Sequence, residues 1–329
     1  MITPNVPAWE PHRWRDELAR AYRTPEELLA DLDLSHVAST LSPFTMLVPR
    51  PFAARMRRGD PSDPLLRQVL PVQAEHEQVL GFSIDPLAEQ SATIAPNLIQ
   101  KYSNRALVIT TPGCAVHCRY CFRRHFPYQD HQPNVLDSAI EAISTDNSLS
   151  EVILSGGDPL LLPDAAFSKL IKRLNQIAHL KRIRIHTRLP IVLPQRVTED
   201  LLNLLQSSRA EMVLVIHCNH AQELDHDTAR AFRLLKARVA ALFNQSVLLS
   251  GVNDDARAQI ELCEALFKQG VLPYYLHLPD PIAGTQHFFV GQSEGLAIHQ
   301  EMQRSLPGYL TPKLVKEVAG EAHKLLVTR

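Results

Sequence analysis

Three of the five cysteines in the chain lie within the segment GCAVHCRYCF at residues 113–122. They are Cys114, Cys118 and Cys121, with the spacing C-x3-C-x2-C. Grouped thiols in a chain of this size usually hold a metal or an iron–sulfur centre and do not form a disulfide framework. A four-iron cluster held by only three cysteines has one iron without a protein ligand. Such an open iron can bind and activate a small molecule, and this is the chemistry that the spacing favours.

A structural zinc site is the alternative chemistry for these thiols. Such a site usually has four protein ligands, and the segment supplies only three cysteines. Cys218 or His117 would then be the fourth ligand. The fifth cysteine, Cys263, lies on an apolar helix face and is expected in the core.

The composition argues against several classes of protein. The 329 residues suffice for one large domain or two ordinary ones. A net charge of −1 does not favour nucleic-acid binding. No apolar stretch approaches the ~18 residues of a membrane helix, and the N-terminus lacks the apolar core of a signal peptide. Together with the grouped thiols, this predicts a cytoplasmic protein without nucleic-acid or membrane partners.

The elements that position the cysteines follow a regular pattern from about residue 105. Short aliphatic runs alternate with helical segments, as in a parallel sheet whose strands are buried on both faces. Six strands are fewer than the eight of a closed barrel, so the sequence predicts an α/β fold with an open, partial (β/α)6 barrel. Ligands gather at the C-terminal ends of such strands, where the polar motifs of this chain lie. The expected strands are 106–111, 151–156, 182–187, 212–217, 245–250 and 272–277.

Three regions are expected along the chain. Residues 1–100 should form a helical and irregular N-terminal extension, because prolines interrupt regular structure over 42–64. Residues 101–290 should form the partial barrel, and residues 291–329 a short C-terminal segment.

The cysteine loop resembles that of the radical S-adenosylmethionine (SAM) enzymes, with Tyr120 and Phe122 on either side of the last cysteine. The resemblance implies a [4Fe–4S] cluster on the three cysteines, with SAM on the open iron and cleaved to a 5′-deoxyadenosyl radical. The segment SGGDP at 155–159 resembles the part of these enzymes that meets the SAM amino group, and its glycines permit close backbone approach. The implied SAM contacts in this segment are Ser155, Gly156, Gly157 and Asp158.

A closer resemblance, to the lysine 2,3-aminomutase family, covers roughly residues 95–324. It implies an isomerase that moves the amino group of L-lysine from C2 to C3 and makes (R)-β-lysine, with pyridoxal phosphate (PLP) as a further cofactor. The segments that carry it are KYSNRALVITTPGCAVHCRYCFRR, LSGGDPL, RIHTRLPIVLPQRVT, IHCNH, NQSVLLSGVND, PDPIAGTQHF and PGYLTPKLVKEVAGEAHK.

The resemblance also implies which residues bind PLP, in the C-terminal segment and ahead of the first strand. Lys324 aligns with the lysine that binds PLP covalently, and only Gly320 remains of the glycine-rich run before it. Lys101, Tyr102 and Arg105 align with the residues that bind the PLP phosphate. Lys101 stands where close relatives have arginine, so it keeps the charge and loses the bidentate fork.

Further residues are implied for the substrate and for SAM. Arg123 aligns with the arginine that binds the substrate carboxylate, whereas Arg124 is expected to be structural. Asp280 and Glu317 align with two acids that bind the distal amino group of lysine. Glu317 replaces an aspartate, so its carboxylate reaches about one bond further.

Gln245 aligns with a residue near the SAM ribose, and His217 lies close to it at the end of a predicted strand. His217 or His220 is either a neutral hydrogen-bond partner in the site or an ordinary histidine at a strand end. The role of Cys218 stays open as well.

The compact chain, which ends five residues after Lys324, resembles the branch of the family that serves the modification of elongation factor P. The resemblance implies lysine as substrate, a functional link to elongation factor P and its lysyl ligase, and an external reductant of the flavodoxin or ferredoxin type. Two alternatives remain: a lysine 2,3-aminomutase of free-lysine metabolism, and a non-catalytic scaffold stapled by metal.

Overall fold

The computed structural model describes residues 10–130 and 136–328. Within them, one sheet carries ten strands in their order along the chain. The strands from β3 to β9 run parallel, whereas β1, β2 and β10 pair antiparallel at the two edges. The strands are β1 Thr93–Ala95, β2 Leu98–Tyr102, β3 Arg105–Thr111, β4 Glu151–Gly156, β5 Arg182–Thr187, β6 Glu211–His217, β7 Ala241–Val247, β8 Leu272–His277, β9 Lys313–Lys316 and β10 Leu325–Leu326.

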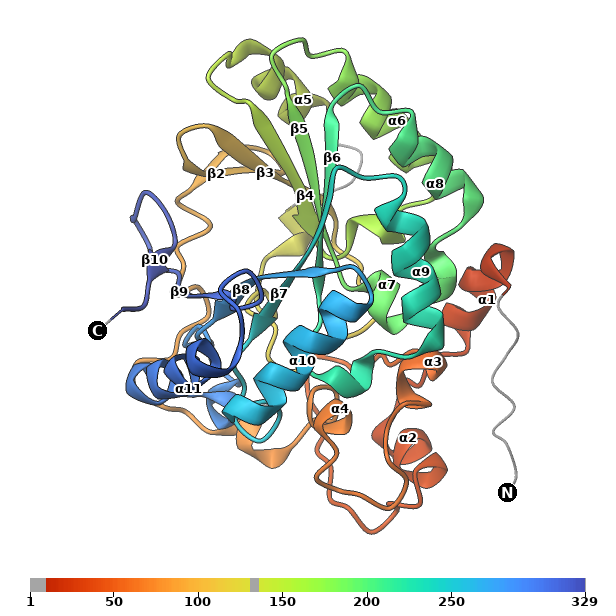
Figure 1. Ribbon diagram of the computed structural model, residues 1–329, viewed down its shortest axis with the longest axis vertical. Coiled ribbons are helices and arrows are strands. Elements are labelled where there is room, and N and C mark those ends of the chain that lie inside the picture. The colour runs from red at the N-terminus through yellow and green to blue at the C-terminus, as the bar shows by residue number, and fades with distance from the viewer. Residues whose placement is uncertain (1–9, 131–135, 329) are drawn as a thin grey trace.

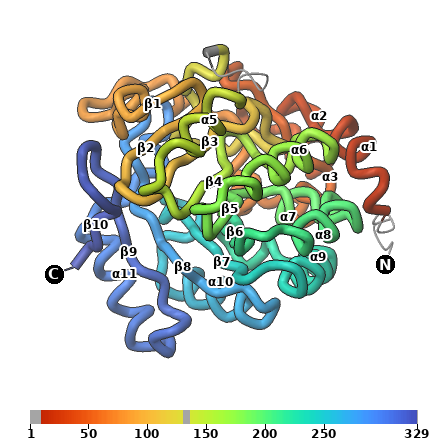
Figure 2. Tube along the Cα trace, turned by 90° about the horizontal axis from the view of Figure 1, so that it is seen from above, coloured from red at the N-terminus to blue at the C-terminus, as the bar shows by residue number. Residues whose placement is uncertain are grey.

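Helices cover one side of this curved sheet. Seen from above, the strands follow an arc from β2 to β9, and α5, α6, α8, α9 and α10 lie on its outer side (Figure 2). Of the short helices of the N-terminal region, α2, α3 and α4 lie below α7 and α9, and α1 lies beside α9 (Figure 1). The helices are α1 Trp14–Ala19, α2 Pro25–Asp31, α3 Arg50–Ala53, α4 Pro64–Arg67, α5 Leu136–Thr145, α6 Asp164–Asn175, α7 Leu189–Val192, α8 Glu199–Gln206, α9 His226–Lys236, α10 Ala256–Lys268 and α11 Gln292–Ser305.

The two faces of the sheet differ in polarity, and this difference creates the site. Along β5, Ile183 and Ile185 are buried in the main apolar core, while Arg184 and His186 point to the inner side of the arc. Successive side chains of a strand alternate between faces, so the sequence RIRIHT builds one apolar and one polar face. Burial also alternates along β7, although its buried positions include the polar Asn244 and Ser246. The expectation of strands that are apolar on both faces therefore holds for β4 but not for β5 and β7.

The α/β class and the open parallel sheet are confirmed, with differences in two of the parallel strands. The strand predicted at 245–250 is β7 and begins earlier, at Ala241. Alanine and leucine favour helices, so the sequence predicts helix up to Phe243, whereas α9 ends at Lys236. In addition, β9 is a seventh parallel strand beside β8. Its four residues, KLVK, are too few to show a strand period, and lysine at both ends makes it look like a surface helix.

The N-terminal region also contains two strands that were not expected there. The strands β1 and β2 form a hairpin around Asn97, whose φ of 63° is left-handed. A Pro-Asn pair is a common turn signal, since asparagine tolerates this conformation. The strand β2 pairs with β3 as well as with β1, so Lys101 and Tyr102 lie on the second strand of the sheet and not in a segment ahead of it.

The division at residues 100 and 290 stays a prediction, and the sheet runs across both positions. No helix among the described residues is both long and apolar enough to span a bilayer.

Candidate active site

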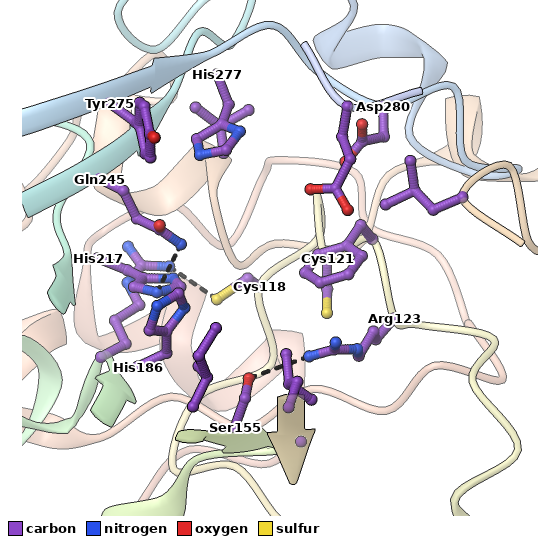
Figure 3. Close-up of a pocket in the computed structure, with 18 of the residues that line it drawn as sticks. Cys118, Cys121, Arg123, Ser155, His186, His217, Gln245, Tyr275, His277 and Asp280 are labelled. Atoms are coloured by element: carbon purple, nitrogen blue, oxygen red, sulfur yellow. Dashed lines mark hydrogen bonds between the residues drawn. The ribbon is translucent and has the colours of Figure 1, made fainter. Parts of the chain in front are cut away.

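A cavity of about 320 Å³ lies inside the arc, where the parallel strands end. Every residue that the resemblance implies for the cluster, SAM, PLP or lysine lines this cavity, although these residues are spread over more than two hundred positions of the chain. They are Lys101, Tyr102, Arg105, Cys114, Cys118, Cys121, Arg123, Ser155, Gly156, Gly157, Asp158, His217, Gln245, Asp280, Glu317 and Lys324. His220, the alternative to His217, does not line it. Figure 3 shows that Cys118, Cys121, Arg123, His217, Gln245 and Asp280 face a common space.

The cysteine loop follows β3 and is fixed by the N-terminal region. The backbone N–H of His117 donates to the carbonyl of Leu47 at 3.0 Å, and that of Arg119 donates to the carbonyl of Gln68 at 2.8 Å. The Arg119 side chain is fully buried and pairs with Glu75. A loop without regular structure is thus held by backbone bonds and one buried ion pair, which keeps its three cysteines in place.

The three thiols belong to one loop and line one cavity. Among the described residues, no group of three or more histidine, cysteine, aspartate or glutamate side chains is arranged to hold one metal ion. In a four-iron cluster each cysteine binds a different iron, so the three sulfurs need not converge on one point.

The two residues considered as a fourth zinc ligand have other contacts. The ring Nδ1 of His117 lies 2.8 Å from the carbonyl of Thr45. Cys218 is fully buried outside the cavity lining, and its thiol lies 3.5 Å from the carbonyl of His220. Cys263 is a buried core residue, as predicted.

Burial governs the protonation of two of the loop thiols. Burial and the neighbouring Cys118 raise the pKa of Cys121 to about 11. Burial likewise raises the pKa of Cys114 well above its usual range. Thiolates are the ligands of metals, so binding of a cluster must displace protons from this loop.

The turn after β4 lies directly against the cysteine loop. The N–H of Gly157 donates to the carbonyl of Thr111 at 2.7 Å, and that of Asp158 donates to the carbonyl of Gly113 at 2.8 Å. A Cβ atom on Gly157 would lie 2.0 Å from the Gly113 oxygen, and Gly156 has a φ of 115°. Only glycine permits this approach, so the two glycines of SGGDP bring the turn and the loop together.

The carboxylate of Asp158 organises the loops after β4 and β5. It caps the backbone N–H of Leu160 at 3.0 Å and accepts hydrogen bonds from the Thr187 hydroxyl and the Arg188 N–H, both at 2.7 Å. Burial nevertheless raises its pKa. Its contact with SAM stays a prediction; the bonds observed here are structural.

Five charged side chains alternate in sign across the cavity. In order, they are Arg123, Glu89, Lys101, Glu317 and Lys324. The Nε and Nη2 atoms of Arg123 donate to the two oxygens of Glu89 at 2.7 and 2.8 Å. The Lys101 ammonium lies 3.2 Å from Glu89 and 2.8 Å from Glu317. Lys324 donates to the other oxygen of Glu317. The predicted cofactor lysine is therefore tied to the predicted substrate arginine through two carboxylates.

Asp280 and Glu317 are neighbours because they follow the adjacent parallel strands β8 and β9. Burial and the charge of Glu317 raise the pKa of Asp280 to about 7. Burial acts on Glu317 in the same direction, but Lys324 and Lys101 outweigh it and lower the pKa of Glu317 to about 2. Within this pair, Glu317 is ionised at neutral pH, and Asp280 changes its protonation state close to pH 7.

Three neutral histidines extend from β5, β6 and β8 into the cavity (Figure 3). Burial, followed by the charges of Arg188 and Arg123, lowers the pKa of His217 to about 3, and burial lowers that of His186 and His277 well below the usual value. The Nε2 of His217 lies 3.0 Å from the Nε2 of Gln245. The Nε2 atoms of His186 and His277 are buried without a hydrogen-bond partner among the described residues. Such orphaned polar atoms indicate that the cavity is built for a ligand.

The predicted phosphate-binding residues lie at the β2–β3 edge of the cavity. The Arg105 guanidinium lies over the Tyr102 ring, 4.5 Å from its centroid. Burial, followed by the charge of Glu317, raises the pKa of Tyr102 to about 12, so its hydroxyl is a donor at neutral pH. In the described part of the chain Arg105 forms no ion pair, which leaves its charge available.

Comparison with known proteins identifies the family. Residues 108–263 match the Radical SAM superfamily. The chain is 44% identical to an L-lysine 2,3-aminomutase of Haemophilus influenzae over 99% of this chain and 98% of the relative. It is also 44% identical to an L-lysine 2,3-aminomutase of Escherichia coli over 98% of this chain and 96% of the relative. It is 34% identical to an L-lysine 2,3-aminomutase of Clostridium subterminale over 94% of this chain and 76% of the relative.

The chain belongs to the lysine 2,3-aminomutase family. The predicted family and enzyme class, an isomerase, are thereby confirmed, and so is the radical SAM character of the barrel. Membership in the radical SAM superfamily implies a [4Fe–4S] cluster and SAM.

Sequence reasoning missed several residues that line this cavity, among them Glu89, Arg188, His186 and His277. Glu89 is buried and bonded to Arg123 and Lys101, yet in the sequence it stands in the unremarkable segment DPLAEQ. Arg124 is structural, as predicted: it pairs with Glu75 and donates to the carbonyl of Gly284 at 2.7 Å.

Proposed function

We propose that this protein is a radical SAM, PLP-dependent isomerase that converts L-lysine to (R)-β-lysine by moving the amino group from C2 to C3. The observation that supports it most is the content of one cavity, where a three-cysteine loop, a lysine amine and a pair of carboxylates meet. Identity of 44% to lysine 2,3-aminomutases over nearly the whole length supports it independently.

Cys114, Cys118 and Cys121 would hold the cluster, and the turn with Ser155, Gly156 and Gly157 lies beside the space left for SAM. When bound, these groups supply one-electron cleavage of SAM and a carbon-centred radical. The contribution of the chain is to position them: Gly157 and Gly113 keep turn and loop in contact, while apolar side chains such as Leu249 and Phe288 shield the cavity from water.

The residues present also fit PLP, which supplies a covalent link to amino groups and an electron sink when bound. Lys324 places an amine in the cavity, and Glu317 orients it. Arg105 and Tyr102 offer a cation and a hydroxyl donor to a phosphate. The unpartnered Nε2 atoms of His186 and His277 offer further polar contacts to a bound ligand.

The substrate roles follow from charge. The Nε and Nη2 atoms of Arg123 donate to Glu89. The Nη1 atom, which also donates to Ser155 Oγ at 3.1 Å, therefore remains for the carboxylate of lysine. Asp280 and Glu317 would bind the distal ammonium, whose attraction to them is strengthened by the low dielectric of a closed cavity. A substrate with an anion at one end and a cation at the other fits both groups.

An anaerobic assay tests the proposal. The protein is reconstituted with iron and sulfide and given PLP, SAM, a strong reductant and L-lysine, and β-lysine is sought by chiral chromatography with mass detection. We expect (R)-β-lysine that requires both SAM and PLP. Cleavage of SAM without β-lysine would overturn lysine as substrate. A folded, cluster-loaded protein that yields neither product would favour the scaffold alternative.

We further propose that the β-lysine serves the modification of elongation factor P by its lysyl ligase in the cytoplasm, with a flavodoxin- or ferredoxin-type reductant. Support comes from similarity: the chain is 44% identical to the Haemophilus and Escherichia relatives and 34% identical to the Clostridium relative. Disruption of the gene should remove a β-lysyl mass increment from elongation factor P. An unchanged mass would favour the free-lysine alternative.

A further inference from the structure

A buried arginine reaches the cysteine loop from the end of β5. Arg188 follows Thr187, the last residue of that strand, and its Nη1 lies 2.8 Å from the Sγ of Cys118 and 2.5 Å from the hydroxyl of Tyr120. The bond to the Cys118 sulfur is drawn in Figure 3. Because an arginine is always charged, it brings a cation and an N–H donor to a sulfur that would ligate the cluster.

Contacts on every side fix the position of this guanidinium. Its Nη2 donates to Glu223 at 3.0 Å and to the Gln68 side-chain oxygen at 2.6 Å, and its backbone N–H donates to Asp158. Both acceptors of Nη2 are fully buried. The planar fork allows one side chain to hold Glu223 with one nitrogen and approach the sulfur with the other, which a lysine could not do with the same geometry.

Two features argue that the contact is more than packing. The Nε of Arg188 is buried without a hydrogen-bond partner among the described residues, so the side chain gives up one bond to keep its orientation. Furthermore, Tyr120 already receives a hydrogen bond from Asn219 at 2.7 Å and Glu223 already receives one from the Asn219 N–H, so neither depends on Arg188 alone. The Nη1 of Arg188 donates to the sulfur of Cys118, and the Tyr120 hydroxyl, which Arg188 also contacts, hydrogen-bonds to the same thiol.

We propose that Arg188 is a positioning residue for the cluster: it donates a hydrogen bond to the Cys118 sulfur and thereby raises the reduction potential of the cluster. One electron from an external one-electron carrier adds to the cluster and makes it more negative by one charge. A cation and a hydrogen-bond donor at a ligand sulfur stabilise that reduced state more than the oxidised one. Arg188 keeps its protons, and no bond to it is made or broken. The proposal rests on the proposed function only in assigning the cluster to the three cysteines.

The test compares the reconstituted wild-type protein with two variants of the contact. Arg188→Lys keeps a charge beside Glu223 and loses the fork. Arg188→Gln combined with Glu223→Gln removes both charges, so that no carboxylate is left buried and unpaired. Arg119→Lys is the matched control, because Arg119 is a buried arginine of the same loop whose side-chain bonds go to Ser42, Phe44 and Glu75 and not to a cysteine sulfur.

The reduction potential is measured by electron paramagnetic resonance during a redox titration without SAM, PLP or lysine, after the iron content has been checked. We expect the equilibrium constant for reduction to fall about tenfold in both variants, a shift of about −59 mV for one electron, and to stay unchanged in the control. An unchanged potential in iron-loaded variants would overturn the proposal. A shift that arises only with SAM present would do so too, since Arg188 would then act on SAM.

A measurement on the wild-type protein keeps the proposal testable even if the variants lose iron. Labelling of arginine with 15N should give a nitrogen coupling to the reduced cluster in pulsed electron paramagnetic resonance, and Arg119→Lys should retain it. Absence of this coupling would overturn the contact. A wild-type protein that binds no cluster at all would overturn the proposed function itself, so the two failures are distinguishable.

Discussion

Two carboxyl groups of the same cavity ionise at different pH values because their neighbours differ. The ammonium groups of Lys324 and Lys101 lower the pKa of Glu317 to about 2. Burial and the charge of Glu317 raise the pKa of Asp280 to about 7. In the protein without ligands, Asp280 is therefore protonated below neutrality. An arriving ammonium group would supply the cation that this carboxylate lacks, so binding of lysine should be linked to the loss of a proton.

This linkage predicts a pH dependence of lysine binding. Only ionised Asp280 attracts the distal ammonium, so the KM for lysine should fall as pH rises towards 7, by about tenfold per unit below the pKa. Steady-state assays between pH 5.5 and 8 measure it. Asp280→Asn should have a high KM with a flat profile, and a variant that keeps the steep wild-type profile would contradict the assignment.

The effect of pH on stability is opposite to its effect on binding: raising the pH favours lysine binding but reduces the free energy of unfolding. The folded protein holds the Asp280 proton more tightly than the unfolded chain, so this stabilisation is present at low pH and is lost as pH rises through about 7. Asp280→Asn should therefore raise the free energy of unfolding of the cofactor-free protein at pH 8 by ~2–4 kcal/mol, with little change at pH 4. Urea unfolding at both pH values measures this. Glu317→Gln is the control with opposite sign, since it removes a carboxylate whose pKa is lowered.

Glu89 forms ion pairs with both Arg123 and Lys101 and so holds the two cations together. Glu89→Gln should raise the KM for lysine about tenfold and destabilise the protein by ~3–5 kcal/mol, since both cations lose their buried partner. Kinetics and urea unfolding measure the two effects. Glu151→Gln is the control: Glu151 also binds two cations, Arg182 and Arg184, but does not itself line the cavity, although Arg184 does. An equal KM in both variants would contradict a role of Glu89 in the site.

At the scale of elements, the turn after β4 and the loop after β3 act as one unit. Gly157→Ala would place a Cβ atom 2.0 Å from the Gly113 oxygen, so the two segments must separate. We expect a loss of bound iron after reconstitution and a destabilisation of ~2 kcal/mol or more. Iron analysis and thermal unfolding measure this. Gly291→Ala, where a Cβ would meet nothing within 4 Å, should behave as wild type; full iron binding by Gly157→Ala would refute the coupling.

The elements also show what the sequence can and cannot predict. Five of the parallel strands are apparent from runs of aliphatic residues. The cysteine loop is apparent from its spacing, whereas the expected PLP and substrate residues follow only from the resemblance to the lysine 2,3-aminomutase family. The short strand β9 and the β1–β2 hairpin are not apparent, because pairing with neighbouring strands stabilises them more than their own composition does. Glu89 and Arg188 escape prediction for a related reason: their partners lie 34 and 70 positions away, and no local pattern marks such pairs.

At the scale of the whole molecule, the N-terminal region serves as a support for the cysteine loop. Glu75 is buried and binds both Arg119 and Arg124, which flank the last cysteine. Burial would raise the pKa of Glu75, but the two arginines outweigh it and lower that pKa, so the carboxylate stays charged. The region outside the barrel thus determines the geometry of the loop within it.

Glu75→Gln tests this support. Removing the charge leaves two buried arginines without their carboxylate, so we expect a destabilisation of ~3–5 kcal/mol and weaker retention of iron. Denaturant unfolding and iron analysis measure both. Glu17→Gln, which removes a partly buried glutamate paired with the exposed Arg20, should cost less than ~1 kcal/mol. Equal effects in the two variants would contradict a special role of the N-terminal region.

The supports of the cysteine loop come from both ends of the chain, and this has a consequence for biosynthesis. Leu47, Gln68 and Glu75 leave the ribosome before the loop does, whereas Gly284, which binds Arg124, and the strand β9 leave it after the loop. A nascent chain thus has its loop supported on one side while the opposite wall of the cavity is still missing. We expect this interval to be the most accessible moment for inserting an iron–sulfur cluster, before β8 and β9 close the wall that carries Asp280 and Glu317.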